Sequence, residues 1–221
     1  MLNIKNISKT YIDNNKRLTV LDNLSLKVEK SQIITIFGKS GIGKSTLLNI
    51  IGGLAFPDNG TIKINNNLFE YDKCFEKFRS DNFGYIFQED NLLPEFTVEE
   101  NLMIPSMITN FNYNKTLNDI NNYLSFFHMS NYLNSYPSQL SKGERQRISI
   151  IRSIIKNPKI ILADEPTANL DEKNIELILS LFVKLNKELN YTFIIATHDK
   201  SFQKISDKIY EIKKKKLRLL K

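Results

Sequence analysis

Cysteine pairs, long apolar runs and a chain-wide excess of one charge are all missing from this 221-residue sequence. Cys74 is the only cysteine, so an internal disulfide is impossible and a reducing compartment suits the chain. No apolar run reaches the roughly 18 residues that would span a bilayer, and the N-terminal segment lacks the apolar core of a secretory signal. We therefore expect a cytosolic chain that does not insert into the bilayer and relies on another chain for any membrane-embedded part.

The formal net charge of +7 comes almost entirely from the C-terminus. Residues 213–221 hold six basic side chains and no acidic one, which leaves a charge of only +1 on residues 1–212. The main part of the chain therefore has no excess of basic residues to form a groove for nucleic acid, and we expect no nucleic-acid partner. We interpret the basic segment as a solvated tail, with weak attraction to anionic lipid as the alternative.

Length and composition predict a single compact α/β domain over residues 1–221. Short segments rich in Ile, Val and Thr predict a small antiparallel sheet in the first third of the chain, at 2–11, 19–30, 32–38 and 60–66. The helical spacing of apolar residues such as Leu117, Ile120 and Leu124 then predicts a mostly helical insertion at about 92–150.

The last third of the chain alternates between strand and helix patterns. Two continuous apolar segments, 159–166 and 191–199, flank a long stretch with helical spacing from Ile175 to Leu185. Apolar strands separated by a helix are typical of a parallel sheet that is covered on both faces. The sequence therefore predicts a parallel-sheet core beside the smaller antiparallel sheet.

A glycine-rich segment follows the strand predicted at 32–38. Gly38, Gly43, Lys44 and Ser45 fit the P-loop spacing G-x-x-x-x-G-K-[ST], between an apolar strand and an amphipathic helix. Such glycines let successive backbone amides point at phosphate oxygens, while the lysine reaches the outer phosphates and the serine hydroxyl can bind Mg²⁺. A chance match in a turn is the alternative, but it leaves the flanking strand and helix unexplained. The candidate phosphate-binding residues are Gly38, Lys39, Ser40, Gly41, Gly43, Lys44, Ser45 and Thr46.

Two adjacent carboxylates, Asp164 and Glu165, follow the apolar segment Ile160 to Leu162. The carboxyl end of such a strand is where an α/β fold meets its phosphates. Asp164 would hold Mg²⁺ through water, and Glu165 would polarise a water molecule in line with the γ-phosphate. Surface charge is the alternative, and it explains poorly why both acids end an apolar strand.

The segment "LSKGERQR" at 140–147 predicts a helix start that faces an anion. Ser141 and Glu144 have the S-x-x-E spacing of a capping box, in which each side chain bonds the other residue's amide. Gly143 would then be the second helical residue and expose backbone amides at the positive end of the helix dipole. Lys142 would be the first helical residue, with its side chain in solvent, and a direct contact with the anion is the alternative.

Together these segments resemble the ATP-binding subunits of ABC transporters over nearly the whole chain. The motifs occur in the family's order: an aromatic residue at Tyr11, the P-loop at 38–45, the Q-loop Gln88, the signature "LSKGE" at 140–144, the Walker B segment at 160–165, the D-loop "ANLD" at 168–171 and the switch histidine His198. Each alone is weak, but the ordered set is specific. The resemblance implies an α/β P-loop NTPase fold with a RecA-like parallel-sheet core, an antiparallel β subdomain and a helical insertion.

The resemblance also implies ATP and Mg²⁺ as cofactors and two kinds of partner. Two copies of the chain would form a head-to-tail dimer, with each ATP between the P-loop of one copy and the signature helix of the other. Two integral-membrane permease subunits would complete the complex. This chain would bind them as a peripheral subunit at the cytoplasmic face of the inner membrane. The anion at Gly143 would then be the γ-phosphate of the nucleotide bound to the other copy.

Roles for individual residues follow from the same resemblance. Tyr11 would stack on adenine, Gln88 would link Mg²⁺ to the membrane-facing surface, and Asp171 would report across the dimer. The catalytic residues would be Glu165, His198 and Lys44. Outside the P-loop, nucleotide would be bound by Tyr11, Gln88, Ser141, Gly143 and Asp171. The ligands of Mg²⁺ would be Ser45, Gln88 and Asp164.

Within the family, "NLLPEFTVEEN" after Gln88 and the later "LSKGERQR" look like the ATP-binding subunit of the lipoprotein-releasing system. Lys142 and Ala168 depart from it, since glycine is usual at both positions. Leu92, Leu93, Pro94 and Phe96 would offer an apolar surface to a helix of the membrane subunit, with ordinary core packing as the alternative. Direction of transport and cargo rest on analogy, because cargo contacts would lie on the membrane chains.

Other functions stay open on the sequence alone. An exporter of macrolides or antimicrobial peptides, or a cell-division ABC complex, would use a similar ATPase subunit. A soluble ABC ATPase acting on DNA or ribosomes generally has two cassettes or long coiled coils, and this sequence has neither. A P-loop kinase would leave the signature, the D-loop and His198 unexplained.

Overall fold

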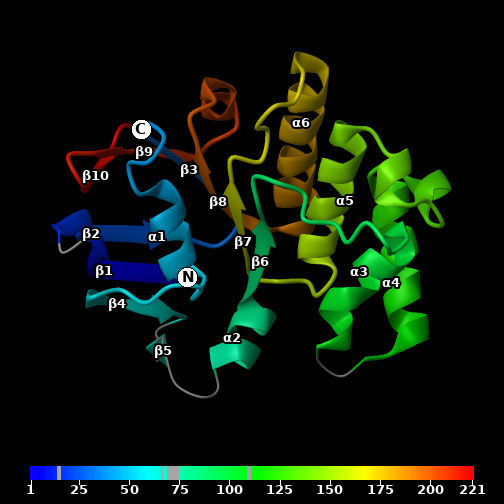
Figure 1. Cartoon of the computed structure of the whole chain (residues 1–221), viewed down its shortest axis with the longest axis horizontal. Coiled ribbons are helices and arrows are strands. Elements are labelled where there is room, and N and C mark those ends of the chain that lie inside the picture. Colours follow the sequence, from blue (N-terminus) through cyan, green and yellow to red (C-terminus); the bar gives the residue numbers. More distant parts are fainter. Residues whose placement is uncertain (14–15, 66, 69–74, 109–110) are drawn as a thin grey trace.

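The computed structural model describes residues 1–13, 16–65, 67–68, 75–108 and 111–221 (Figure 1). Its strands are β1 (Leu2–Asp13), β2 (Lys16–Val28), β3 (Ile33–Phe37), β4 (Asn59–Ile64), β5 (Asn67–Leu68), β6 (Phe83–Ile86), β7 (Ile160–Asp164), β8 (Thr192–Thr197), β9 (Lys208–Lys213) and β10 (Lys216–Leu219). Its helices are α1 (Lys44–Ile51), α2 (Phe75–Asn82), α3 (Val98–Met107), α4 (Tyr113–Phe126), α5 (Lys142–Ile154) and α6 (Glu172–Leu189), with short 3₁₀ helices at Ser130–Tyr132, Pro137–Gln139 and Lys200–Lys204.

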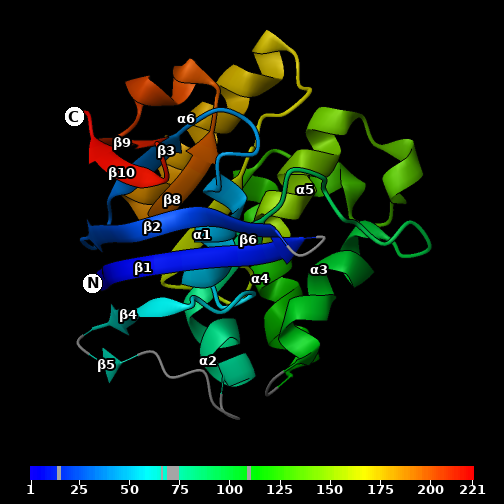
Figure 2. The same ribbon diagram turned by 60° about the vertical axis from the view of Figure 1, so that its left-hand side comes forward.

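The smaller sheet is antiparallel and has the order β2-β1-β4-β5. β1 pairs with β2 along its whole length, with register shifts between Ile4 and Thr10 that bend the ribbon. Buried residues alternate with exposed ones along the second half of β2, so one face of this sheet enters the core. Figure 2 shows β1 and β2 side by side.

The larger sheet has the order β10-β9-β3-β8-β7-β6, and its strands β9, β3, β8, β7 and β6 are parallel. Successive residues of its central strands enter two different cores. Ile160 and Leu162 face α1 and the antiparallel sheet, whereas Ile161 and Ala163 face α5 and α6. Because both faces are covered, these strands are apolar at almost every position, as the sequence predicted.

Helices cover the two faces unequally. α1 contacts β7 and β8 on the face that also meets the antiparallel sheet, while α3, α4, α5 and α6 pack on the other face (Figure 1). α6 has the predicted apolar stripe, including the buried Ile178, Phe182 and Leu185. This arrangement brings the carboxyl ends of β3, β7 and β8, and the loops that follow them, to one edge of the sheet.

Two expectations from the sequence are wrong. The segment 32–38 does not join the antiparallel sheet: its strand β3 lies between β8 and β9 in the parallel sheet, because its residues are buried on both faces. The C-terminal segment is not a free tail, since β9 and β10 form a hairpin through Lys214 and Lys215. The basic side chains of residues 213–221 are nevertheless exposed, as predicted.

Cys74 and the end of the strand predicted at 60–66 lie outside the described residues. Among the described residues, no helix is long and apolar enough to cross a membrane.

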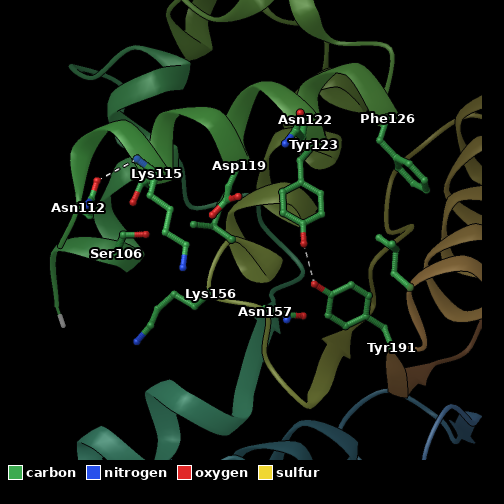
Figure 3. A pocket seen from close by; sticks show the side chains of 13 residues that line it. Ser106, Asn112, Lys115, Asp119, Asn122, Tyr123, Phe126, Lys156, Asn157 and Tyr191 are labelled. Carbon is green, nitrogen blue, oxygen red and sulfur yellow. Dashed lines mark hydrogen bonds between the residues drawn. The ribbon is translucent and has the colours of Figure 1, made fainter. Parts of the chain in front are cut away.

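A cavity of about 730 Å³ lies where α4 meets the end of α5 and the start of β8 (Figure 3). The hydroxyl groups of Tyr123 and Tyr191 meet there at 2.9 Å. Burial raises the pKa of the Tyr191 hydroxyl, so the pair is neutral and joins α4 to the core by an ordinary hydrogen bond. None of the motif residues lines this cavity, which therefore lies apart from the phosphate site.

Candidate nucleotide site

The P-loop joins β3 to α1 and has the shape that its glycines allow. Gly41 and Gly43 have φ angles of 74° and 109°, in the left-handed region that favours glycine. Gly43 also backs closely onto β2, because a Cβ at this position would lie 2.7 Å from Val20 Cγ1. The loop is thereby held against the antiparallel sheet, with Lys39 and Ser40 exposed at its tip.

Lys44 begins α1 and turns back into this loop. Its side chain is only 5% exposed, and Nζ donates to the carbonyl oxygens of Gly38 at 2.9 Å and Lys39 at 3.3 Å. Nζ also lies 3.2 Å from Glu165 Oε1. A buried ammonium is therefore fixed between the glycine loop and the end of β7, where an outer phosphate would need it.

Glu165 is the centre of a hydrogen-bond network at the sheet edge. Its Oε2 accepts hydrogen bonds from the Thr197 hydroxyl at 2.8 Å and the His198 amide at 3.2 Å, and it lies 3.0 Å from His198 Nδ1. Burial alone would raise the pKa of Glu165, but the hydrogen bonds from His198, Thr197 and Lys44 outweigh it and lower the pKa below its ordinary value. Glu165 is thus an ionised carboxylate at neutral pH.

The backbone of Glu165 also has an unusual conformation. Its φ angle is 46°, an uncommon value for a residue with a long side chain. The Glu165 amide donates to the Ala196 carbonyl at 2.8 Å, which fixes this turn against β8. Strain of this kind, about 1–3 kcal/mol, persists mainly where the surroundings hold a functional residue in place.

Asp164 and Ser45 provide oxygen ligands of the kind that Mg²⁺ prefers. Burial raises the pKa of Asp164, and a hydrogen bond with the Ser45 side chain opposes that rise. Asp164 Oδ1 is buried and has no hydrogen-bond partner among the described residues. A buried carboxylate oxygen without a partner beside a hydroxyl fits a hard cation.

The signature helix begins as predicted. Ser141 is the N-cap of α5, its hydroxyl accepts from the Glu144 amide at 3.3 Å, and Glu144 Oε2 accepts from the Ser141 amide at 2.7 Å. Lys142 is the first residue of the helix and its side chain is exposed, as expected. Gly143 is buried against Asn174 of α6, rather than lying open at the helix end.

The three remaining motif residues, Tyr11, Gln88 and Asp171, are all exposed. Tyr11 pairs with Leu18 in the antiparallel sheet, two positions along β2 from the contact with Gly43, and its ring is 42% exposed. Gln88 follows the carboxyl end of β6 and is exposed. Asp171 is exposed as the N-cap of α6.

The structure thus brings the motifs together in two separate groups. Lys44, Ser45, Asp164, Glu165 and His198 meet at the edge of the parallel sheet. At the starts of α5 and α6, the signature residue Gly143 packs against Asn174, which in turn bonds the D-loop residue Asp171. No hydrogen bond or ion pair of the described residues joins these two groups.

Sequence reasoning missed some contributors. Thr197 donates to Glu165 from the end of β8, and its position immediately before His198 is the only local signal for that contact. Asn174 bonds Asp171, and Arg152 donates to the carbonyl oxygens of Asp90 and Asn91 at 2.7 Å each. The contacts of Thr197 and Arg152 join segments far apart in the sequence, so spacing could not reveal them, whereas Asn174 lies only three residues after the N-cap Asp171.

A parallel sheet with a glycine loop after β3, a buried lysine and two acids ending β7 define a P-loop nucleotide hydrolase. Residues 21–168 match the family described as ABC transporter. The chain belongs to this family, and its site is that of an ATPase.

Curated relatives match almost the full chain. One is the lipoprotein-releasing system ATP-binding protein LolD of Rickettsia bellii, 41% identical over 213 residues that cover 96% of this chain and 95% of that protein. Another is the LolD protein of Cytophaga hutchinsonii, 40% identical over 210 residues that cover 94% of each chain. Among solved structures, the dimeric post-hydrolysis state of the ATP-binding cassette MJ0796 bound to ADP and Pi has a TM-score of 0.89 and 34% identity, and covers 100% of this chain and 99% of that one.

Proposed function

We propose that the chain is the ATP-hydrolysing subunit of an ABC transporter that releases lipoproteins from the inner membrane. The observation that carries this proposal is the near full-length similarity to proteins named as lipoprotein-releasing ATP-binding subunits, at 41% identity over 213 residues. The chain would act at the cytoplasmic face of the membrane, with separate chains supplying the membrane-embedded part.

The geometry of the phosphate site supports a separate role in hydrolysis for each of its residues. The amides of the P-loop and Lys44 bind and orient the β- and γ-phosphates. Glu165, kept ionised by its hydrogen bonds, orients and polarises the attacking water. His198, whose side chain is 72% exposed and points Nδ1 at Glu165, steadies this water and the γ-phosphate. Tyr11, near the end of β1, stacks on the adenine.

Ser45, Asp164 and Gln88 would hold Mg²⁺, which would screen the negative charge of the phosphates. The orphan Asp164 Oδ1 and the neighbouring Ser45 hydroxyl support this assignment. Gln88 lies in the exposed segment after β6, so its position would couple the metal to the protein surface.

A head-to-tail dimer would complete the site. The exposed N-terminus of α5 is separate from the P-loop of its own chain, so the signature residues Ser141 and Gly143 would contact nucleotide on a second copy. Two features support this: the positive end of the α5 helix dipole, at an exposed Ser141 and Lys142, suits an anion, and the similar cassette MJ0796 was solved as a dimer. Asp171 would meet the partner copy beside the signature helix.

A groove beside the Q-loop segment offers a docking place for a membrane subunit. A cavity of about 580 Å³ lies between α2, β6 and α3, and its lining includes Leu54, Phe87 and Ile108, all exposed. Leu93 and Phe96 are also exposed nearby in sequence, at 43% and 41%. Leu92 differs from the expectation, because it is buried in the core that contains α5 and α6. An apolar surface of this kind suits a short helix from a partner.

Movement at this groove would reach the signature helix through arginines of α5. Arg152 donates to the carbonyl oxygens of Asp90 and Asn91, and Arg145 Nε lies 3.0 Å from Asp90 Oδ2. The segment directly after Gln88 is therefore bound to the same helix that carries Gly143. A membrane subunit that shifts this segment would shift α5 with it.

Copurification tests the transporter assignment. We expect the tagged chain, isolated from detergent-solubilised membranes of its own cell, to bring with it two related multi-span proteins with large periplasmic domains. Leu93→Asp, which places a charge on the exposed apolar surface, should reduce the recovery of both, whereas Glu188→Gln on the distant end of α6 should not. Recovery of uptake permeases, a division protein or ribosomes instead would contradict lipoprotein release.

A further inference from the structure

Asn174, a residue in the first turn of α6, lies between the D-loop and the signature helix. Its backbone amide donates to Asp171 Oδ1 at 2.8 Å, as expected of a residue three positions after an N-cap. Its side-chain amide additionally donates to both carboxylate oxygens of Asp171, each at 3.0 Å. The hydrogen bonds to Asn174 lower the pKa of Asp171, so the carboxylate is held ionised and in one orientation.

The side-chain amide of Asn174 also packs closely against Gly143. A Cβ at position 143 would lie 2.1 Å from Asn174 Oδ1 and 2.5 Å from its Cγ, so no side chain fits there unless Asn174 moves. Gly143 lies inside α5 and does not have a positive φ angle. Its backbone conformation therefore does not demand glycine, whereas the close approach of Asn174 does.

One side chain thus links the two segments that would face a partner copy. Among the described residues, Asn174 donates its hydrogen bonds to Asp171 and makes none with Lys44 or Glu165. Because its amide is fixed by Asp171, it sets the distance between Asp171 and the start of α5. If Asp171 or Gly143 moved alone, this contact would be lost.

We propose that Asn174 is a positioning residue that locks the D-loop to the signature helix, so that both meet the partner copy as one surface. This proposal rests on the proposed head-to-tail dimer. Without the amide, each segment would reach the partner independently, and ordering both would oppose dimer formation. The effect should therefore fall on turnover and on ATP-dependent dimerisation, and not on nucleotide binding by the single chain.

The test compares Asn174→Ala, Gly143→Ala and the double variant with the parent chain and with Glu176→Ala, an exposed control on the same helix. We expect Asn174→Ala to lower kcat by about 2- to 30-fold without raising KM for ATP, in the range known for residues that couple two sites. Dimerisation with ATP, measured by sedimentation in the Glu165→Gln background, should weaken in parallel. Nucleotide affinity and Tm should match the Glu176→Ala control.

The double variant tests whether Asn174 and Gly143 act through one contact or whether the two substitutions cause independent defects. Removing the Asn174 side chain makes room for a Cβ at position 143, so the double variant should be less impaired than the product of the two single effects. Strictly multiplicative losses, or an Asn174→Ala protein with the kcat and dimerisation of the parent, would overturn the proposal. If the Glu165→Gln parent itself fails to dimerise with ATP, that result would instead contradict the proposed head-to-tail dimer.

Discussion

Glu165→Gln is expected to reduce steady-state ATP hydrolysis by about 100- to 10,000-fold, the usual contribution of a general base. The carboxylate accepts from Thr197 and His198 and is ionised at neutral pH, whereas an amide of the same shape could neither polarise water nor take its proton. ATP binding should persist, because the P-loop is untouched. Phosphate release and equilibrium binding of a fluorescent ATP analogue measure the two effects separately.

Glu188→Gln is the matched control for this substitution. It makes the same chemical change on the exposed end of α6 and should leave hydrolysis unaltered. Hydrolysis at the parental rate by Glu165→Gln would show that Glu165 is not the general base and that another group at the sheet edge has this role.

Lys44→Ala is expected to weaken ATP binding by about 10- to 100-fold, because a charge-assisted hydrogen bond to phosphate contributes about 1.5–3 kcal/mol. The ammonium is already oriented by the carbonyl oxygens of Gly38 and Lys39, so little reorganisation is needed when a phosphate arrives. Isothermal titration with ATP measures the loss directly.

The same substitution also removes a hydrogen bond that lowers the pKa of Glu165. The pKa of Glu165 should therefore rise in Lys44→Ala, and the stability that its ionised form contributes should be lost at a higher pH as the solution is acidified. Lys63→Ala, on the exposed face of β4, should change neither binding nor this acid transition. Unchanged ATP affinity in Lys44→Ala would contradict the phosphate site.

Local sequence patterns were enough to predict the parts of the site that local geometry determines. The P-loop spacing places Lys44 at the start of a helix after two glycines with positive φ angles, and the S-x-x-E spacing alone produces the capping box of Ser141 and Glu144. The continuous apolar runs of β7 and β8 likewise predicted a sheet buried on both faces.

Contacts between distant segments could not be predicted in this way. The bond from Thr197 to Glu165 exists because β7 and β8 are neighbours in register, and the close fit of Asn174 on Gly143 depends on how α5 and α6 approach. The position of β3 in the sheet was also missed. Its strand character was clear from Ile33 to Phe37, but the sequence does not state which strands it will pair with.

The C-terminal hairpin shows how composition can mislead. Lys214 and Lys215 form its turn with φ angles of 48° and 65°, where glycine or asparagine is the usual signal. A run of four lysines therefore indicated solvent rather than strand. Backbone pairing of β9 with β3 and β10 nevertheless holds the segment in the sheet, while the charged side chains point outward.

The most direct test is sedimentation velocity of the Glu165→Gln protein with and without ATP and Mg²⁺. The proposed head-to-tail site predicts a monomer without nucleotide and a dimer with ATP, since binding persists but hydrolysis cannot separate the two copies. Adding Lys44→Ala to this variant should abolish the dimer, whereas adding Lys142→Gly should not change it. A monomer under every condition would contradict a site shared between two copies.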